Sequence, residues 1–454
     1  MRIIVSNNIK IIEPDEQIKD YAEKKLVILN PEYLRNERLG YSNYKTPMHL
    51  VFYEINGNEL ILPFGCLTDL FAMYSLELFE NRIVLGKHLT YKSNIKLFNY
   101  QEKVCQKAVL RKNGIIVMPA GSGKTQTALE IIARLRLKTL WITHTIDLLN
   151  QSYDRAKNNF ENVGLGKIAN GKIEIGTHIT FATVQTLKSI DLQTYADTWD
   201  CIIVDECHRI CGTPAKAGMF YKVINKLVAR YKYGLTATPY RNVKGTEIAM
   251  FSLIGKTIIE LDKDVIGNRI IPATVIKVKT EFNKIPDKCL EVDGTIKYAT
   301  LTTVLSQDLE RNNLILDILK KCKNNYTLVL VDRVEQMYYL KEKLGYGNVV
   351  DGKTKKNIRE KAIEEVREGK EKVLIATYGL AKEGLDIPRL DRLILASPHR
   401  DKATVIQAIG RIERKFENKA NPICYDLVEP IQYFENMYRN RKSYYKKNNN
   451  LIVE

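Results

Sequence analysis

Short apolar runs that alternate with amphipathic stretches dominate the chain from residue 114 onward. Four runs lie in the middle of the sequence, at residues 114–120, 139–145, 178–184 and 200–206. Four more lie nearer the C-terminus, at residues 327–333, 372–378, 392–397 and 423–428. Runs this short and this rich in Val and Ile, with helical stretches between them, are typical of parallel strands buried on both faces. The pattern therefore predicts two doubly wound, parallel-sheet α/β domains, over residues 96–262 and 263–430.

Residues 1–95 show a different pattern. Strands are expected at residues 9–14, 48–55 and 58–65. Asn56-Gly57, between the last two, is a strong hairpin signal. Residues 14–29 predict one helix, because a proline and acidic residues fall in its first turn. These elements predict a small α+β accessory domain without a catalytic signature.

Three further segments lie outside these patterns. Asp293-Gly294 stands between alternating runs and predicts a β-hairpin over residues 289–298. Residues 302–322 predict one helix. Residues 431–454 predict a polar, basic tail, in which five Lys and Arg oppose two Glu and Tyr444-Tyr445 are interleaved with the charges.

Composition narrows the class of protein. The chain has 454 residues, with 70 Lys and Arg against 53 Asp and Glu, so its net charge is +17. This excess favours a polyanionic partner, and nucleic acid before a membrane surface. No apolar run reaches the roughly 18 residues needed to span a bilayer, and early acidic residues argue against a signal peptide. Eight cysteines do not form a disulfide framework, which indicates a reducing, cytoplasmic setting.

The most specific motif is MPAGSGKT, residues 118–125, which follows a predicted strand and precedes a predicted helix. Such a loop cradles phosphates: the backbone of Gly121, Ser122 and Gly123 supplies N–H groups, helped by the dipole of the helix. Lys124 is expected at the β- and γ-phosphates and Thr125 at Mg²⁺. The strict pattern begins with Gly, where this chain has Met.

A second motif is IIVDECH, residues 202–208, at the end of another apolar strand. Nucleotide hydrolases hold Mg²⁺ at such a carboxylate. Asp205 is therefore expected to contact the metal, and Glu206 to orient or deprotonate the attacking water.

Together with later motifs, these residues resemble superfamily 2 helicases. GSGKT, DECH, LTATPYR (235–241), ATYGLAKEGLDIP (376–388) and QAIGRIER (407–414) occur in the order of that superfamily, and the resemblance covers about residues 97–430. Within it the chain looks most like the XPB-type group, including phage branch-migration helicases of the UvsW kind. The resemblance implies two tandem RecA-like domains with ATP between them.

The resemblance also implies roles for residues of the first large domain. Gln101 matches the glutamine that reads adenine, although Phe98 stands where an Arg is common. His208, Thr236 and Thr238 match residues that couple hydrolysis to movement. Thr145, Thr183 and Gln185 match contacts to the DNA backbone, with His144 in place of the usual Pro before Thr145.

In the second large domain, Gly384 and Asp386 match residues at the ATP cleft, and Thr377 a contact to the strand. Thr354 is a further candidate contact to the strand. Arg411 and Arg414 match arginine fingers, and Gln407 lines the same cleft. Residues 407, 411 and 414 have i, i+4, i+7 spacing, which would place all three on one face of a helix.

The motifs lead us to expect an ATP- and Mg²⁺-dependent DNA helicase that acts as a monomer. The resemblance, together with the accessory domain and the predicted hairpin, implies action on branched or forked DNA. The accessory domain would recognise the branch. The predicted hairpin would be either a strand-splitting wedge or a packing element, and the basic tail either a non-specific DNA contact or a solvated end. A compact chain of this kind suits a phage or bacterial source, with action in the cytoplasm.

Three alternatives remain open from the sequence. The first is an RNA helicase of the same superfamily, since DECH also occurs there. The second is an ATP-driven translocase on duplexes that does not separate strands. The third is a non-catalytic clamp on a dead motor fold, which the presence of Lys124, Asp205, Glu206, Arg411 and Arg414 disfavours.

Overall fold

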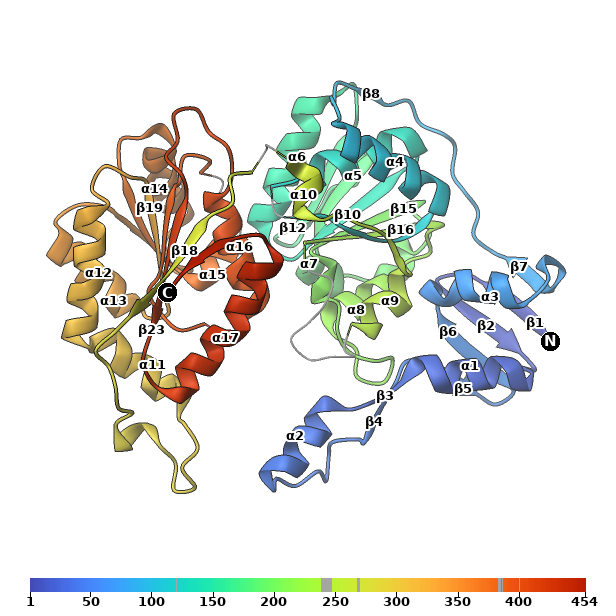
Figure 1. The fold of residues 1–454 in the computed structure, drawn as a ribbon. Helices are drawn as coiled ribbons and strands as arrows, with labels where there is room; N and C mark the ends of the chain where they lie inside the picture. Colours follow the sequence, from blue (N-terminus) through green and yellow to red (C-terminus); the bar gives the residue numbers. More distant parts are fainter. Residues whose placement is uncertain (120, 238–246, 268–269, 383–384, 386, 400) are drawn as a thin grey trace. The chain divides into compact units, whose positions relative to one another are not determined.

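The computed structural model describes residues 1–119, 121–237, 247–267, 270–382, 385, 387–399 and 401–454. The chain divides into two compact units (Figure 1). Unit 1 comprises Met1–Pro119 and Gly123–Asp262, and unit 2 comprises Ala120–Ser122 and Lys263–Glu454.

Unit 1 is built on an eight-stranded sheet in the order β13-β12-β14-β10-β15-β16-β9-β17. Only the β12–β13 pair is antiparallel. The strands are β9 (Asn113–Val117), β10 (Thr139–Thr143), β12 (Leu165–Ala169), β13 (Lys172–Ile173), β14 (Ile179–Thr183), β15 (Cys201–Asp205), β16 (Tyr231–Thr236) and β17 (Thr257–Glu260). All four strands predicted for this domain are present. Every residue of β10, β14 and β15 is buried, as expected for a sheet covered on both faces.

The helices of this domain follow the strands in the order of a doubly wound fold. They are α4 (Asn99–Arg111), α5 (Lys124–Leu135), α6 (Ile146–Asn159), α7 (Val184–Ser189), α8 (Met219–Ile224) and α9 (Ile248–Ile254). A short ribbon, β8 (Lys92–Ser93) with β11 (Phe160–Glu161), lies beside them.

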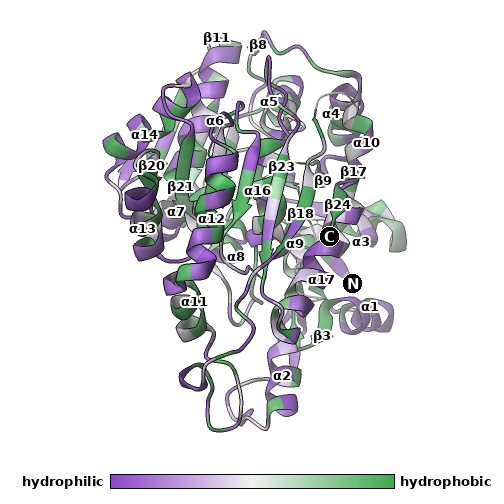
Figure 2. Cartoon of the chain, turned by 60° about the vertical axis from the view of Figure 1, so that its left-hand side comes forward, coloured by the Kyte–Doolittle hydropathy of each residue, from purple (hydrophilic) through white to green (hydrophobic). Residues whose placement is uncertain are grey.

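Unit 2 has a seven-stranded, all-parallel sheet in the order β20-β21-β19-β22-β23-β18-β24. The strands are β18 (Thr274–Lys279), β19 (Thr327–Val331), β20 (Asn348–Val350), β21 (Val373–Thr377), β22 (Arg392–Leu395), β23 (Ile423–Val428) and β24 (Leu451–Val453). The helices are α10 (Lys263–Ile266), α11 (Tyr298–Gln307), α12 (Leu309–Lys321), α13 (Val334–Leu344), α14 (Lys356–Glu368), α15 (Tyr378–Lys382), α16 (Lys402–Ile412) and α17 (Gln432–Lys447). The predicted pair of RecA-like domains is therefore confirmed. Figure 2 shows hydrophobic residues along the strands and hydrophilic ones on the outward faces of helices.

The first 80 or so residues form a separate five-stranded sheet in the order β5-β6-β2-β1-β7. Its strands are β1 (Arg2–Val5), β2 (Asn8–Ile12), β5 (Glu54–Asn56), β6 (Glu59–Pro63) and β7 (Phe79–Asn81), with helices α1 (Glu16–Leu26) and α3 (Leu67–Met73). The predicted hairpin is present, but Asn56 still belongs to β5, so the turn is Gly57-Asn58.

Two predictions in this domain need correction. The helix expected over residues 14–29 ends at Leu26, because residues 27–29 form β3 (Val27–Leu29), which pairs with β4 (His49–Val51). The single strand expected over residues 48–55 is for the same reason split into β4 and β5. Between β3 and β4 lies α2 (Pro31–Leu39).

The accessory sheet packs against the parallel-sheet domain through one continuous apolar core. A Cβ atom added to Gly65 would lie 2.2 Å from the carbonyl oxygen of Phe251 in α9, so the two backbones approach closely. Asn7 donates to the carbonyl of Asn225 at 2.5 Å. The accessory domain is therefore fixed to the first RecA-like domain within unit 1.

Lys232 of β16 lies at this contact and is buried. Its ammonium nitrogen lies 4.2 Å from the centre of the Phe64 ring and 3.5 Å from the carbonyl oxygen of Asn7. Burial lowers the pKa of Lys232 to about 7.

Three predictions in unit 2 also need correction. The helix expected over residues 302–322 is two helices, because the Asp308 carboxylate caps α12 by accepting from the N–H of Arg311 at 2.8 Å. The predicted hairpin at residues 289–298 is reduced to one bridge, Leu290 with Ile296, around a tight turn.

The segment predicted as a basic tail is part of the fold. It forms α17 and β24, and β24 extends the sheet beside β18. Phe434, Tyr438 and Tyr445 are buried, which a solvated tail would not allow. Among the residues that the structure describes, no helix has the length and apolar character needed to cross a membrane.

Candidate nucleotide and nucleic-acid site

The phosphate-binding loop connects β9 to α5. Gly121 and Gly123 both have φ of +80°, in the left-handed region that glycine adopts without strain. Gly123 is the N-cap of α5, which leaves the first N–H groups of that helix directed at the loop. The ammonium of Lys124 donates to the carbonyl oxygen of Met118 across the loop at 3.4 Å. This geometry suits an anion held by backbone N–H groups and one lysine.

Gln101 lies directly against this loop. Its side-chain oxygen accepts from the N–H of Phe98 at 3.0 Å, which holds the amide at the start of α4. A Cβ atom on Gly123 would lie 2.4 Å from the amide nitrogen of Gln101. The residue predicted to read adenine is therefore packed on the residues predicted to hold phosphate.

The two acidic residues of the second motif lie at the end of β15. Glu206 has φ of +50°, an unusual backbone conformation for a residue with a side chain, and such strain is concentrated at functional sites. Its N–H donates to the Asp205 carboxylate at 3.0 Å. Nδ1 of His208 lies 3.2 Å from the Glu206 carboxylate and 3.1 Å from the Thr236 hydroxyl. The end of β15 is thus joined to the end of β16.

The two carboxyl groups have opposite electrostatic environments. Burial, reinforced by the charge of Glu206, raises the pKa of Asp205, and the Lys124 ammonium opposes that rise. Burial alone would also raise the pKa of Glu206, but the contact with His208 and the charges of Lys124 and Arg209 lower it. Asp205 is therefore biased towards its protonated form, and Glu206 is held ionised.

The candidate strand contacts of unit 1 differ in accessibility. Thr145 is the N-cap of α6 and accepts from the N–H of Leu148 at 3.4 Å, so its hydroxyl hydrogen can still be donated. Thr183 is buried, and its hydroxyl pairs with that of Thr186 at 3.0 Å. Gln185 is exposed at the start of α7.

In unit 2, Gln407 and Arg411 lie on α16, as predicted, but Arg414 does not. The helix ends at Ile412, and Arg414 forms an antiparallel bridge with Ile270. The reason is the buried carboxylate of Glu413, which accepts from the N–H of Ala273 at 3.2 Å and from Asn450 at 2.7 Å. These bonds pull the chain out of the helix, so the expected three-residue helical face is wrong for Arg414.

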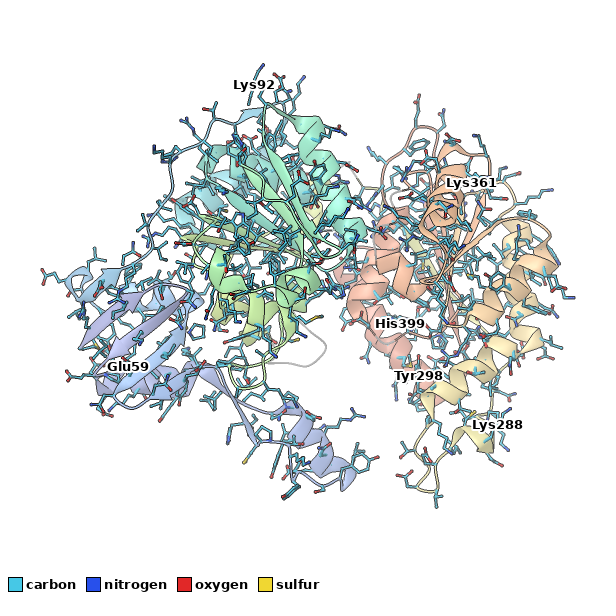
Figure 3. All side chains as sticks on the ribbon, turned by 180° about the vertical axis from the view of Figure 1, so that it is seen from behind. Glu59, Lys92, Lys288, Tyr298, Lys361 and His399 are labelled. Atoms are coloured by element: carbon cyan, nitrogen blue, oxygen red, sulfur yellow. The ribbon has the colours of Figure 1, made fainter. Side chains whose placement is uncertain are left out.

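A buried network supports the segment before α16, and the sequence analysis missed it. Arg441 of α17 forms two hydrogen bonds to Asp426 of β23, at 2.8 and 2.9 Å, and donates to the carbonyl of His399 at 3.2 Å. The His399 ring stacks on Tyr378, with centroids 4.4 Å apart, and Tyr445 donates to Asp426 at 2.7 Å (Figure 3 labels His399). Because Tyr378 directly follows Thr377, the network ties two motif segments to α17.

One signal could have revealed this network. Asp426 interrupts an apolar strand, and a carboxylate inside a sheet requires a cationic partner from elsewhere in the chain. Arg441 in the segment read as a tail was such a candidate.

The remaining predicted residues are placed as follows. Thr354 donates to the Asp351 carboxylate at 2.6 Å in the turn before α14. Thr377 ends β21 and is partly exposed. Thr238, Gly384 and Asp386 lie outside the described residues. The described part of the chain contains no cluster of three or more His, Cys, Asp or Glu suited to a metal ion.

Two family models match the chain. The model described as type III restriction enzyme, res subunit, matches residues 94–241, and the helicase conserved C-terminal domain matches residues 310–415. The DNA 3'-5' translocase XPB2 of Sulfurisphaera tokodaii is 27% identical over 390 residues, which cover 77% of this chain and 86% of that protein. A protein of Acanthamoeba polyphaga mimivirus named as an ATP-dependent RNA helicase is 26% identical over 457 residues, which cover 95% of this chain and 82% of that protein.

Among solved structures, S. cerevisiae Dbp5 bound to RNA and ADP BeF3 is similar, with a TM-score of 0.57 and 16% sequence identity over 77% of this chain and 89% of that one. This likeness shows the shared fold of two RecA-like domains. With the two matching family models, the XPB relative and the phosphate-binding geometry, the chain belongs to superfamily 2 of the helicases, is related to its XPB-type group, and is an ATP-hydrolysing enzyme that depends on nucleic acid.

Proposed function

We propose that this chain is an ATP- and Mg²⁺-dependent DNA helicase that unwinds or branch-migrates forked and junction DNA in replication, recombination or repair. The observation that carries the proposal is the cluster at the ends of β15 and β16. There Glu206 is held ionised by His208, which also bonds Thr236. A change at the nucleotide would act on both strand ends, as coupling of hydrolysis to movement requires.

The donor groups fit Mg²⁺. Asp205 is a buried carboxylate at the end of β15, and Mg²⁺ prefers such oxygen ligands. Asp205 and the hydroxyl of Thr125 would hold the ion. When bound, it would neutralise charge on the phosphate oxygens.

The chain's own residues would carry the remaining steps. Lys124 and the loop N–H groups would bind the phosphates, and Gln101 would bind the base. Glu206 would orient the attacking water and accept its proton. Gln407, Arg411, Arg414, Gly384 and Asp386 are proposed from their motifs to complete the nucleotide site.

The DNA contacts we propose are Thr145, Thr183, Gln185, Thr354 and Thr377, with Thr238 in the coupling group. Hydroxyl, amide and backbone donors bind phosphate oxygens rather than base edges, so translocation should be largely independent of sequence.

Two observations support DNA and a branched substrate. The relative from S. tokodaii is named a DNA translocase. The accessory domain is fixed to the first RecA-like domain, so a branch held by one would keep a constant position relative to the other. A monomer suffices, since the motifs for both halves of the ATP site lie on one chain.

ATP-dependent strand separation tests the proposal. The substrates are a plain duplex, a single-tailed duplex, a three-way fork and a four-way junction, each as DNA and as RNA, with Glu206→Gln as the inactive control. We expect the fastest separation on DNA forks or junctions. ATP hydrolysis without separation on any substrate would contradict the proposal and indicate a duplex translocase.

The second candidate is an RNA helicase, which the name of the mimivirus relative favours. The same experiment separates the two: stronger stimulation of ATP hydrolysis and faster separation on RNA would replace the DNA assignment.

A further inference from the structure

An ordered projection extends from the accessory domain. We call residues 27–51 the arm; it consists of β3, α2 and β4. Figure 1 shows the arm extending away from the five-stranded sheet. The helix is well capped, since the Asn30 side chain accepts from the N–H of Glu32 and Gly40 closes the other end with φ of +67°. Yet no residue of α2 is buried, so the arm is an ordered element without a core.

Only one side of α2 is covered within the arm. Asn43 donates to the carbonyl of Tyr33 at 3.2 Å, and Asn36 donates to Asn43 at 3.0 Å, so the return loop lies along this side. The opposite side is formed by residues three and four apart, which share one face of a helix. It carries the exposed residues Leu34, Arg35, Arg38 and Leu39.

The arm exposes large side chains that a folded domain normally covers. The Tyr44 side chain is 91% exposed and that of Tyr41 is 54% exposed. The arm also exposes Leu29, Leu34, Leu39 and Met48. So many exposed large side chains on one projecting element indicate a binding surface rather than ordinary surface composition.

The charges of the arm indicate the partner. Residues 1–95 contain 11 Lys and Arg against 12 Asp and Glu, so the accessory domain has no general excess of positive charge. Elsewhere in this domain most basic side chains are paired with carboxylates, as in Lys10–Glu59, Lys24–Asp20 and Arg82–Glu80, and among the described residues only Lys25 and Lys87 have no such pair. In contrast, no ion pair among the described residues involves Arg35, Arg38 or Lys45. Three cations without an ion pair, Arg35, Arg38 and Lys45, thus lie in the same arm as the exposed Tyr41 and Tyr44.

An element that exposes both unpaired cations and aromatic rings offers the two kinds of group that bind single-stranded nucleic acid, through phosphates and stacked bases. A duplex would offer phosphates but no free base faces to Tyr41 and Tyr44. A protein partner would use the leucines but would leave three cations in need of acids.

We propose that the arm is a binding site for single-stranded DNA, with Arg35, Arg38 and Lys45 on phosphates and Tyr41 and Tyr44 stacked on bases. The site rests on the proposed function for its substrate class and adds to it a strand contact outside the two RecA-like domains. Glu32 and Glu37, which flank the exposed face of α2, would limit the affinity of the arm for phosphate.

Fluorescence anisotropy with labelled single-stranded DNA, in the full chain and without ATP, tests the site. One variant combines Arg35→Gln, Arg38→Gln and Lys45→Gln, and a second combines Tyr41→Ala and Tyr44→Ala. The matched control neutralises three exposed lysines of α1 by Lys19→Gln, Lys24→Gln and Lys25→Gln. All positions are exposed, and unchanged thermal unfolding verifies that each variant is folded.

We expect the first variant to reduce the slope of log affinity against log salt by about 2, since each single-strand phosphate contact contributes about 0.7. The tyrosine variant should lose roughly tenfold in affinity. The control should bind as the unaltered chain does. An equal loss of affinity in the control would overturn the site. So would unchanged affinity for single-stranded DNA in both arm variants, even if light scattering showed that these variants had changed the molecular mass of the protein in solution. Strand separation is measured apart, so a failure there refutes the proposed function without altering the binding result.

Discussion

The predicted nucleotide-site residues are held in different ways in the two units. In unit 1 they contact each other: Gln101 packs on Gly123, and Glu206 contacts His208, which bonds Thr236. In unit 2, the segment leading to α16 is held by residues outside every motif, since Arg441 binds both Asp426 and the carbonyl of His399. A motif search therefore finds both the candidate site residues and the residues that support them in unit 1, but only the candidate site residues in unit 2.

The largest effect is expected from a substitution that removes the proposed general base from unit 1 but keeps the contacts that hold the site together. Glu206→Gln keeps the shape of the side chain but cannot accept a proton, so kcat for ATP hydrolysis should fall by roughly 10²–10⁴-fold. The thermal unfolding midpoint should change little. Steady-state ATPase assays with saturating single-stranded DNA measure the effect.

Retention of most of the activity by Glu206→Gln would contradict the assignment of the general base. Glu260→Gln at the end of β17, in the same unit, is the control and should leave kcat unchanged.

The next largest effect is expected from a substitution that removes the contacts of Arg441, a residue outside the motifs of unit 2. Arg441→Met leaves the Asp426 carboxylate buried without its cation, and breaking such a pair typically costs about 3–5 kcal/mol. Urea unfolding followed by circular dichroism measures the loss. Arg441→Lys keeps the charge but not both hydrogen bonds, and should lose less.

The control is Lys442→Met, the neighbouring residue, whose ion pair with Glu454 is partly exposed and contributes little. In the folded fraction of Arg441→Lys, kcat for ATP should fall while the KM for DNA stays constant, because α16 moves with His399. An unchanged kcat would mean that the network supports the fold alone.

The third effect concerns the pH dependence of stability, and it arises from Lys232, which lies where the accessory domain contacts the first RecA-like domain. The pKa of Lys232 is lowered to about 7 by burial, against an ordinary value of 10.5. Between these values the unfolded chain binds more protons than the folded one, so stability rises as pH increases from about 7 to about 10. The gain is about 5 kcal/mol at most, because the folded and unfolded pKa values differ by about 3.5 and each pH unit contributes about 1.4 kcal/mol.

Lys232→Met should remove this dependence and stabilise the protein at pH 7. Urea unfolding of both proteins at pH 7, 8, 9 and 10 checks the prediction. Parallel curves for the two proteins would show that Lys232 stays charged through its contacts with Phe64 and Asn7.

A smaller effect tests the packing of motif residues on one another. Gly123→Ala introduces a Cβ atom 2.4 Å from the Gln101 amide, at a φ of +80° that alanine rarely adopts. We expect the KM for ATP to rise roughly tenfold, about 1.4 kcal/mol of binding. Gln101→Ala alone should also raise the KM for ATP, because it removes the proposed contact to the base. In the double variant the two losses should be less than additive, since Gln101→Ala removes the clash but not the strain. Additive losses would mean that loop strain alone sets the effect of Gly123→Ala.

The comparison also explains what the sequence could and could not predict. All eight central strands were predictable, because most of their residues are apolar, and β10, β14, β15 and β19 are buried at every residue. Strands β16 and β18 were missed because Lys232 and Lys277 interrupt their apolar pattern. Partners distant in the sequence accommodate these lysines: Phe64 contacts Lys232, and Glu435 pairs with Lys277 at 2.7 Å.

Contacts between residues distant in the sequence also explain why the predictions of a basic tail and of a helical position for Arg414 were wrong. Tyr445 and Arg441 fold back onto Asp426, and Glu413 bonds Ala273 and Asn450, and none of these pairs has a local signature. The arm could not be predicted from the sequence either, because the feature that distinguishes it is the exposure of its side chains in the folded chain.

The smallest effect is expected at the turn formed by residues 291–295. This turn is held neither by contacts among motif residues nor by the Arg441 network. Its base is fixed by the Leu290–Ile296 bridge and by the buried Cys289, whereas the Val292 side chain at the tip is fully exposed. If the turn is a wedge, Val292→Asp should slow separation of a DNA fork about two- to fivefold, because a charged tip cannot pack against an opened base pair. ATP hydrolysis on single-stranded DNA should be unchanged, since no strand is split there. Lys288→Ser, below the turn, serves as the control. Equal separation rates for Val292→Asp and the control would assign the turn to packing, and would place strand splitting elsewhere in the chain.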